Sequence, residues 1–127
     1  MDSEKKICIT SQGDNLDSEV APRFGRCQYF IIVDTDTLQF EAIENSSINM
    51  RGGAGIQSAQ LIASKDVKIV LTGNVGPNAF TSLQSDGIEI ITGISGTVRE
   101  TIKQYKKGLL KTTKNSTVDA KSGINKK

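Results

Sequence analysis

Apolar positions along the 127-residue chain follow two different spacings, and the spacing changes near residue 50. In the first part, apolar runs at Lys5–Ser11, Gln28–Asp34 and Gln39–Glu44 are separated by turn-forming residues, a pattern typical of strands. The turn formers of Asp34–Leu38 predict that the second and third runs form an antiparallel hairpin. The first third of the chain therefore predicts three strands.

Past residue 50, apolar residues recur at helical spacing in three segments. The first runs to Ser64, the second begins at Pro77 and ends before Gly87, and the third spans Thr97–Tyr105. Proline is favoured at a first helical position, and glycine suits a left-handed residue after a helix. Thr97 with Glu100 matches a capping box, so the sequence predicts three helices.

Two further strands are predicted between these helices, at Val67–Thr72 and Ile88–Ile91. The resulting order is βββαβαβα. Strands joined by helices run parallel, so we expect an α/β fold with a mixed five-stranded sheet. In that sheet the hairpin strand Gln28–Asp34 runs against the other strands.

Glycine-rich junctions precede all three predicted helices, at residues 52–55, 73–76 and 92–96. A helix N-terminus presents unpaired N–H groups and a partial positive charge, which favours a bound anion. The candidate ligand-binding residues at the first two junctions are Gly52, Gly53, Gly55, Gly73, Asn74, Gly76 and Asn78. The alternative is that the glycines only permit tight turns and that the asparagines brace the loops.

The predicted topology brings the loops after the first, third, fourth and fifth strands to one edge of the sheet, where ligands bind in open α/β sheets. The long connection Gln12–Arg26 is one of these loops. Three helix N-termini and the side chains of Arg23, Arg26 and Arg51 would then face one cleft. Arginines placed there would clamp an anion; otherwise they carry surface charge or pair with nearby carboxylates.

Composition excludes several classes of site and partner. The chain has no histidine, which excludes Ser-His-Asp and Cys-His catalytic arrangements and histidine-rich zinc sites. Its 16 basic and 14 acidic residues give no reason to expect a nucleic-acid partner. No apolar run reaches the ~20 residues of a membrane span, and the N-terminus lacks the apolar segment of a signal peptide. We therefore expect a cytoplasmic protein without a membrane partner.

The domain is expected to cover residues 1–110, followed by a tail. From Lys111 onward there are five lysines and one aspartate among polar residues, so residues 111–127 predict a disordered basic tail. Cys27 starts a strand near the predicted cleft, where its thiolate would be able to ligate iron. The alternative for Cys27, and more so for Cys8 inside the first strand, is a small buried side chain.

Three segments resemble the dinitrogenase iron-molybdenum cofactor biosynthesis family, which includes NifX-like proteins and the C-terminal part of NifB-like proteins. They are VAPRFGRCQYFIIVD, GGAGIQSAQLIASKDVKIVLTGNVGPNAF and IKQYKKGLL, and the resemblance covers Ile7–Leu110. It implies a ribonuclease-H-like fold with three α/β/α layers. It also implies a non-enzymatic protein that binds or carries an anionic iron-sulfur or iron-molybdenum cofactor precursor, with cofactor-assembly proteins as partners.

The resemblance also bears on how a cluster would be held. Family members that hold clusters are associated with histidine or cysteine ligands, and this chain has no histidine. Backbone N–H groups and arginines would then bind the sulfides of the cluster.

Two other functions stay open at this point. A ribonuclease-H-like nuclease needs carboxylates around divalent metals, but the apolar run Lys5–Ser11 offers none. A phosphotransferase or hydrolase that uses the glycine loops would lack a base or lysine in those loops. The other option is a regulatory or interaction module that recognises a protein partner through the same sheet edge.

Overall fold

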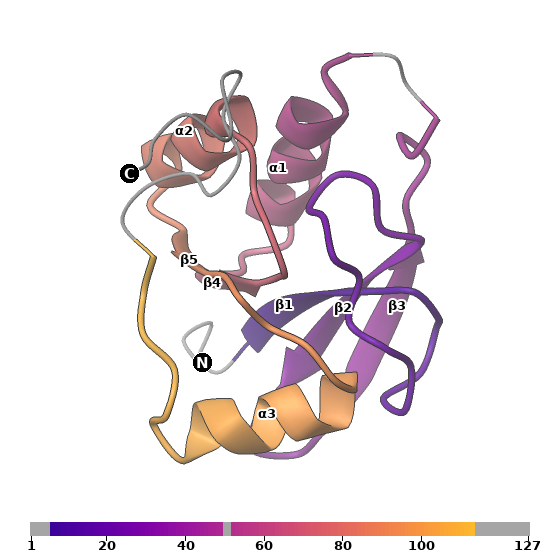
Figure 1. Cartoon of the computed structure of the whole chain (residues 1–127), viewed down its shortest axis with the longest axis vertical. Coiled ribbons are helices and arrows are strands. Elements are labelled where there is room, and N and C mark those ends of the chain that lie inside the picture. Colours follow the sequence, from indigo (N-terminus) through magenta and orange to yellow (C-terminus); the bar gives the residue numbers. More distant parts are fainter. Residues whose placement is uncertain (1–5, 50–51, 114–127) are drawn as a thin grey trace, which may run out of the picture.

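The computed structural model describes residues 6–49 and 52–113. Within them the elements follow the predicted order of three strands and then alternating helices and strands. They are β1 (Lys6–Ser11), β2 (Tyr29–Asp34), β3 (Phe40–Glu44), α1 (Ala54–Ser64), β4 (Ile69–Leu71), α2 (Pro77–Ser85), β5 (Glu89–Ile91) and α3 (Val98–Lys106) (Figure 1). The two strands between helices are shorter than predicted because they pair with their neighbours over few residues.

The strands form one mixed sheet in the order β3-β2-β1-β4-β5. The hairpin strand β2 is antiparallel to both of its neighbours, β1 and β3. β1, β4 and β5 run parallel to one another. This arrangement confirms the prediction of a mixed five-stranded sheet in which one hairpin strand runs against the others.

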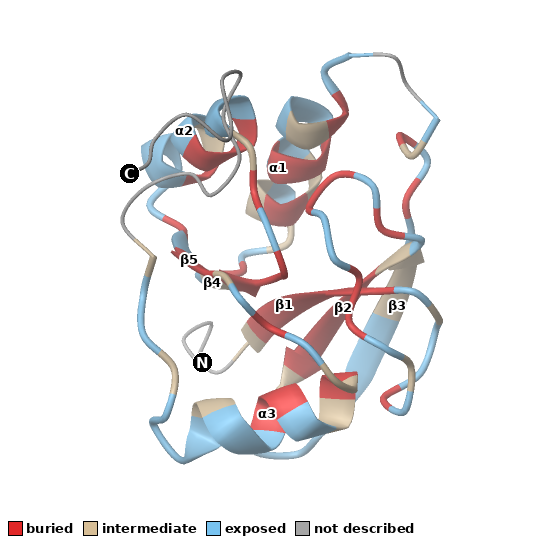
Figure 2. Ribbon diagram, viewed as in Figure 1, coloured by how far each residue is buried: buried red, intermediate tan, exposed pale blue. Residues whose placement is uncertain are grey.

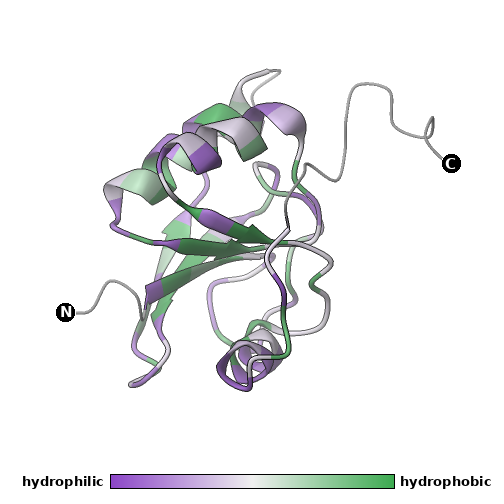
Figure 3. Ribbon diagram, turned by 90° about the vertical axis from the view of Figure 1, so that its left-hand side faces the viewer, coloured by the Kyte–Doolittle hydropathy of each residue, from purple (hydrophilic) through white to green (hydrophobic). Residues whose placement is uncertain are grey.

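The sheet separates two apolar cores, because successive side chains of a strand point to opposite faces. Cys8 of β1 belongs to the core that contains Ile62 of α1 and Leu83 of α2. Its neighbour Ile7 belongs to the core that contains Ile102 of α3. Figures 1 and 3 show α1 and α2 on one face of the sheet and α3 on the other. The fold is therefore α/β with three layers.

Burial follows this layering. The strands β1 and β2 are buried over most of their length, whereas the outward faces of the helices are exposed (Figure 2). β3 forms one edge of the sheet and is mostly exposed or half-buried. No helix within residues 6–49 and 52–113 is long and apolar enough to cross a membrane.

The segment after α3 returns to the other edge of the sheet. The Thr113 N–H donates to the Ile90 carbonyl at 2.6 Å, and Thr113 Oγ1 accepts from the Thr92 N–H at 3.0 Å. Backbone contacts with β5 thus reach beyond residue 110, where the sequence places the end of the domain. Residues 114–127, most of the predicted tail, lie outside the described residues.

Candidate functional site

A cleft of about 180 Å³ lies among the loops that follow β1, β3 and β4. Among the residues predicted from the sequence, those that line it are Arg23, Arg26, Gly53, Gly55, Asn74, Gly76 and Asn78. Gly52, Gly73 and Cys27 do not line it, and Arg51 lies outside the described residues. Sites for drug-sized organic ligands enclose roughly 300–1,000 Å³, so this cleft suits a more compact ligand.

The first turn of α1 presents backbone N–H groups at this cleft. Its N-cap residue Gly53 has the left-handed conformation, with φ 78°, and no side chain caps the helix. The first helical hydrogen bond runs from the Gln57 N–H to the Gly53 carbonyl. The N–H groups of Ala54, Gly55 and Ile56 have no acceptor among the described residues. They carry the partial positive charge of the helix start.

The first turn of α2 is open in the same way. Its N-cap residue is Gly76, and no described side chain caps the helix. The first helical residue is Pro77, as the sequence predicts. The Phe80 N–H donates to the Gly76 carbonyl, while those of Asn78 and Ala79 have no acceptor among the described residues. Neither α1 nor α2 has an acidic residue in its first turn. Two uncapped helix N-termini therefore meet at the cleft.

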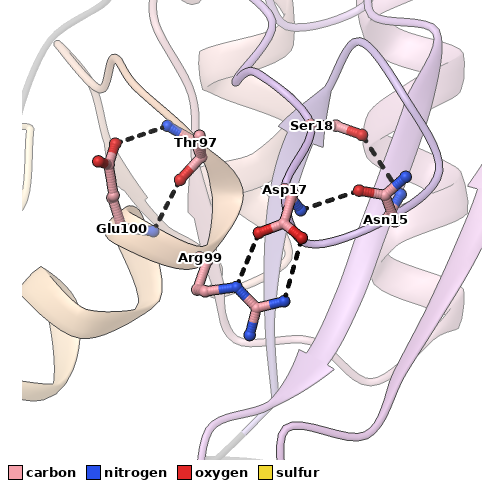
Figure 4. Close-up of polar contacts among 6 residues, drawn as sticks. All are labelled: Asn15, Asp17, Ser18, Thr97, Arg99 and Glu100. Atoms are coloured by element: carbon pink, nitrogen blue, oxygen red, sulfur yellow. Dashed lines mark hydrogen bonds and ion pairs between the residues drawn. The ribbon is translucent and has the colours of Figure 1, made fainter.

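The N-terminus of α3 is closed by the protein itself, so the prediction that three helix N-termini share one cleft is wrong. Thr97 Oγ1 accepts from the Glu100 N–H at 3.1 Å, and Glu100 Oε1 accepts from the Thr97 N–H at 3.0 Å, as the capping box predicts (Figure 4). The next two N–H groups of α3 donate to carbonyls of the loop after β1, at 2.9 and 2.8 Å.

An ion pair fastens the same loop to α3. Asp17 Oδ1 lies 2.9 Å from Arg99 Nε (Figure 4). The hydrogen bond from Arg99, together with its charge, lowers the pKa of the Asp17 carboxyl below its ordinary value. Residues 92–97 do not line the cleft, because α3 packs on the opposite face of the sheet from α1 and α2 (Figure 1).

Small residues let the walls of the cleft approach one another. A Cβ added at Gly25 would lie 3.1 Å from the Gly55 Cα, and Gly25 has φ 93°, which favours glycine. A Cβ added at Gly73 would lie 2.5 Å from the Pro22 carbonyl oxygen. Gly73 therefore serves a close backbone contact between the loop after β1 and the loop after β4, outside the cleft lining.

Asn74 holds that contact in place. Its N–H donates to the Pro22 carbonyl at 2.8 Å, and its own carbonyl accepts from the Phe24 N–H at 2.9 Å. Its side-chain Nδ2 also donates to the Pro22 carbonyl, at 3.3 Å. The loop after β1 is thereby fixed against the start of α2, just where it carries Arg23.

The two arginines of the cleft differ in their contacts. Arg26 Nη1 donates to the Ile48 carbonyl at 2.8 Å, so this side chain also braces the turn after β3. The Arg23 side chain is exposed and has no hydrogen-bond or ion-pair partner among the described residues. Its full charge is available to a ligand.

Cys27 lies behind the wall of the cleft and is only 1% exposed. Burial, partly offset by hydrogen bonds from the backbone, raises the pKa of its thiol to about 12. Burial also raises the pKa of the Cys8 thiol well above its ordinary value. Within residues 6–49 and 52–113, histidine, cysteine and carboxylate side chains form no cluster of three or more that would hold a metal ion. Ligation by Cys27 stays a prediction.

The sequence analysis missed a buried pair of hydroxyl groups near the cleft. Thr10 Oγ1 lies 2.8 Å from Thr72 Oγ1 and 3.3 Å from the Ala21 carbonyl oxygen, and neither threonine is exposed. Thr10 Oγ1 is the donor in both contacts, and because a hydroxyl carries one proton it makes only one of the two bonds at a time. The only signal in the sequence is a threonine near the end of each of two apolar runs.

Comparison with known proteins decides the family. The family model described as dinitrogenase iron-molybdenum cofactor matches residues 5–108. The chain belongs to this family. This family protein is similar in sequence to an uncharacterized protein of Methanocaldococcus jannaschii. It is 33% identical over 96 residues, which are 73% of this chain and 81% of the relative.

Solved structures agree with this membership. The family protein is similar to the apo form of the orange protein from Desulfovibrio gigas, with a TM-score of 0.88 and 35% identity over 91% of this chain and 98% of that chain. It is also similar to a proposed NifB protein from Thermotoga, with a TM-score of 0.76 and 34% identity over 90% and 99% of the two chains.

Proposed function

We propose that this family protein binds and carries an anionic iron-sulfur or iron-molybdenum-type cofactor, or a precursor of it, without turnover. The observation that carries the proposal is the meeting of two uncapped helix N-termini and the unpartnered Arg23 at one compact cleft. The described residues that line the cleft include two arginines and no acidic side chain. Helix dipoles and guanidinium groups both favour a bound anion.

The ligand would be held mainly by hydrogen bonds. The cleft offers backbone N–H groups, amide side chains and guanidinium groups, which donate to sulfide or oxide atoms rather than bind a metal directly. A cluster that brings its own sulfides fits this donor set best. Cys27 is the alternative ligand within the proposal, although reaching it requires the wall of the cleft to open.

Three finer assignments belong to the same proposal. The ribonuclease-H-like class of the fold is supported by the sheet order and by the three layers. Cofactor-assembly proteins would deliver and receive the ligand, in the cytoplasm. Among the residues that the structure describes, the cleft lining holds no acidic, thiol or amine group, which supports carriage rather than acid–base chemistry at the ligand.

Anaerobic titration tests the proposal. Tetrathiomolybdate, a complete sulfide-terminated anion, is the first probe, and an iron-sulfur cofactor precursor is the second. We expect both to be retained through gel filtration, with visible absorption that scales with the protein concentration. Arg23→Gln should weaken binding by about tenfold, the loss of one charge-assisted hydrogen bond.

Thr97→Ala is the matched control, since it removes the cap of α3 and should leave binding unchanged. Cys27→Ala tests direct ligation, and unchanged retention of the probes would remove Cys27 from the set of ligands. A wild-type protein that retains neither probe would overturn the proposed function. Robust hydrolysis of a nucleotide or nucleic acid with Mg²⁺ would overturn the absence of turnover.

A further inference from the structure

Asn45, which follows β3, is buried and uses every polar atom of its side chain. Its Nδ2 donates to the Gly25 carbonyl at 3.1 Å and to the Cys27 carbonyl at 2.9 Å. Its Oδ1 accepts from the Ser47 N–H at 2.9 Å. Only 4% of the residue is exposed, so water does not replace these bonds readily.

This network admits only one orientation of the amide. Two carbonyl oxygens face one end of the side chain and need a donor, while an N–H group faces the other end and needs an acceptor. Turning the amide over would leave both carbonyls and the N–H unpaired. The side chain of Asn45 therefore joins the turn after β3 to residues 25–27 in a single fixed geometry.

The hydrogen bonds of Asn45 act on the cleft lined by Arg23, Arg26 and the first turns of α1 and α2, here called the anion cleft, through Gly25. The backbone of Gly25 packs against the first turn of α1 at Gly55, and Gly55 in turn packs against Ala79 at the start of α2. Arg26, beside Gly25, is held by the turn that Asn45 organises, through the bond to the Ile48 carbonyl. Asn45 itself does not line the cleft.

We infer that Asn45 is a positioning residue for the anion cleft: by holding the carbonyls of Gly25 and Cys27, it sets the distance between the loop after β1, which carries the two arginines, and the N-termini of α1 and α2. The inference rests on the proposed function, because it concerns the same cleft. A purely stabilising role would lower the melting temperature and leave the affinity of the folded protein unchanged.

Asn45→Asp tests this inference with little change of shape. The new carboxylate would face the two carbonyl oxygens without a proton to donate, and repulsion would move residues 25–27 away from Asn45. Thr101→Val is the matched control, because it also removes a buried polar group, whose Oγ1 donates to the Thr97 carbonyl at 2.9 Å, but does so in α3 on the other face of the sheet.

We expect Asn45→Asp to bind tetrathiomolybdate at least about tenfold more weakly than wild type near about pH 8. As the pH falls towards about 6, the carboxylate takes up a proton, because burial raises its pKa, and can again donate to one carbonyl. Affinity relative to wild type should then recover. Thr101→Val should match wild type in affinity at every pH, even where its melting temperature falls as far.

The other ionisable groups beside Asn45 are Arg26, Cys27 and the exposed Glu44. Wild type carries all three, so a difference between the two pH profiles belongs to the new carboxylate. If the Asn45→Asp chain does not fold, Asn45→Ala replaces it. Weaker binding of tetrathiomolybdate by Asn45→Ala than by Thr101→Val would then support the positioning role.

Equal affinity of the Asn45 variant and wild type would overturn the positioning role while leaving the proposed function intact. An equal loss in the Asn45 variant and Thr101→Val would also overturn it, since stability alone would then explain the effect. A wild-type protein that does not bind tetrathiomolybdate would overturn the positioning role together with the proposed function.

Discussion

Gly55 of α1 lies so close to Ala79 of α2 that a Cβ added at Gly55 would be 2.9 Å from the Ala79 Cβ. Real Cβ atoms do not approach this closely, so the missing side chain sets the distance between the two helix starts. The open N–H groups of α1 and α2 face the same cleft for this reason. The spacing depends on the absence of one methyl group.

Gly55→Ala should therefore weaken both tetrathiomolybdate binding and the fold. Overpacking costs about 1–3 kcal/mol, and the better helix propensity of alanine returns up to about 1 kcal/mol, so the free energy of unfolding should fall by at most about 3 kcal/mol. Affinity should fall by about tenfold or more, because the two N-termini separate. Isothermal titration and urea unfolding measure the two effects.

Gly52→Ala is the control for this prediction. Nothing lies within 4 Å of a Cβ built at Gly52, which is exposed and does not line the cleft. Stability should stay within about 0.5 kcal/mol of wild type, with unchanged affinity. If Gly52→Ala weakens binding as much as Gly55→Ala, the close contact with Ala79 does not explain the effect.

Substitutions of Arg23 and Arg26 should change the free energy of unfolding by different amounts. Arg23→Gln should leave the free energy of unfolding within about 0.5 kcal/mol, since its side chain has no partner among the described residues. Arg26→Gln removes the bond to the Ile48 carbonyl and should cost about 0.5–1.5 kcal/mol. Both should lower affinity for the anion, more at low salt than at high salt. Equal stability of the two variants would contradict this division.

The buried hydroxyl pair predicts an asymmetry between two similar substitutions. Thr10→Val should cost about 1–3 kcal/mol of unfolding free energy, because the Ala21 carbonyl and the Thr72 hydroxyl both lose their partner. Thr72→Val should cost less, about 0.5–1.5 kcal/mol, because the Thr10 hydroxyl keeps the Ala21 carbonyl as an acceptor for its proton. The double variant should cost less than the sum. The reverse ranking in urea unfolding would exclude Thr10 as the shared donor of the two contacts.

Alkaline pH should destabilise the fold through its buried thiols. The pKa of Cys27 is raised from an ordinary value of 9.0 to about 12, so the folded thiol stays neutral while the unfolded one ionises. Its contribution to stability is complete below pH 9.0 and is lost as the pH rises towards 12, by up to about 1.4 kcal/mol per pH unit. The raised pKa of Cys8 acts in the same direction.

Cys27→Ala should lessen this alkaline loss relative to wild type, as followed by urea unfolding at a series of pH values. The comparison cancels the titration of lysine and tyrosine side chains, which both chains share. Parallel curves for the two proteins would show that Cys27 ionises equally well in the folded and unfolded states.

Local patterns in the sequence predicted most of the fold. Apolar runs separated by turn formers predicted the strands of the hairpin, Pro77 marks the start of α2, and the capping box of Thr97 and Glu100 closes α3 as expected. These features depend on residues a few positions apart, so spacing along the chain is enough to read them. The lengths of β4 and β5 were overestimated, because pairing with neighbouring strands decides where a strand ends.

The sequence by itself determined the elements, their order and the two glycine junctions that line part of the cleft. Only the tertiary structure decided which N–H groups remain open: the loop after β1 supplies carbonyls to α3 but not to α1 or α2. It also decided that Cys27 lies behind the wall, that Arg26 is a brace, and that Asn45 holds residues 25–27. The physical reason is that a hydrogen-bond donor is free or satisfied according to what lies within about 3 Å of it, and those neighbours come from distant parts of the chain.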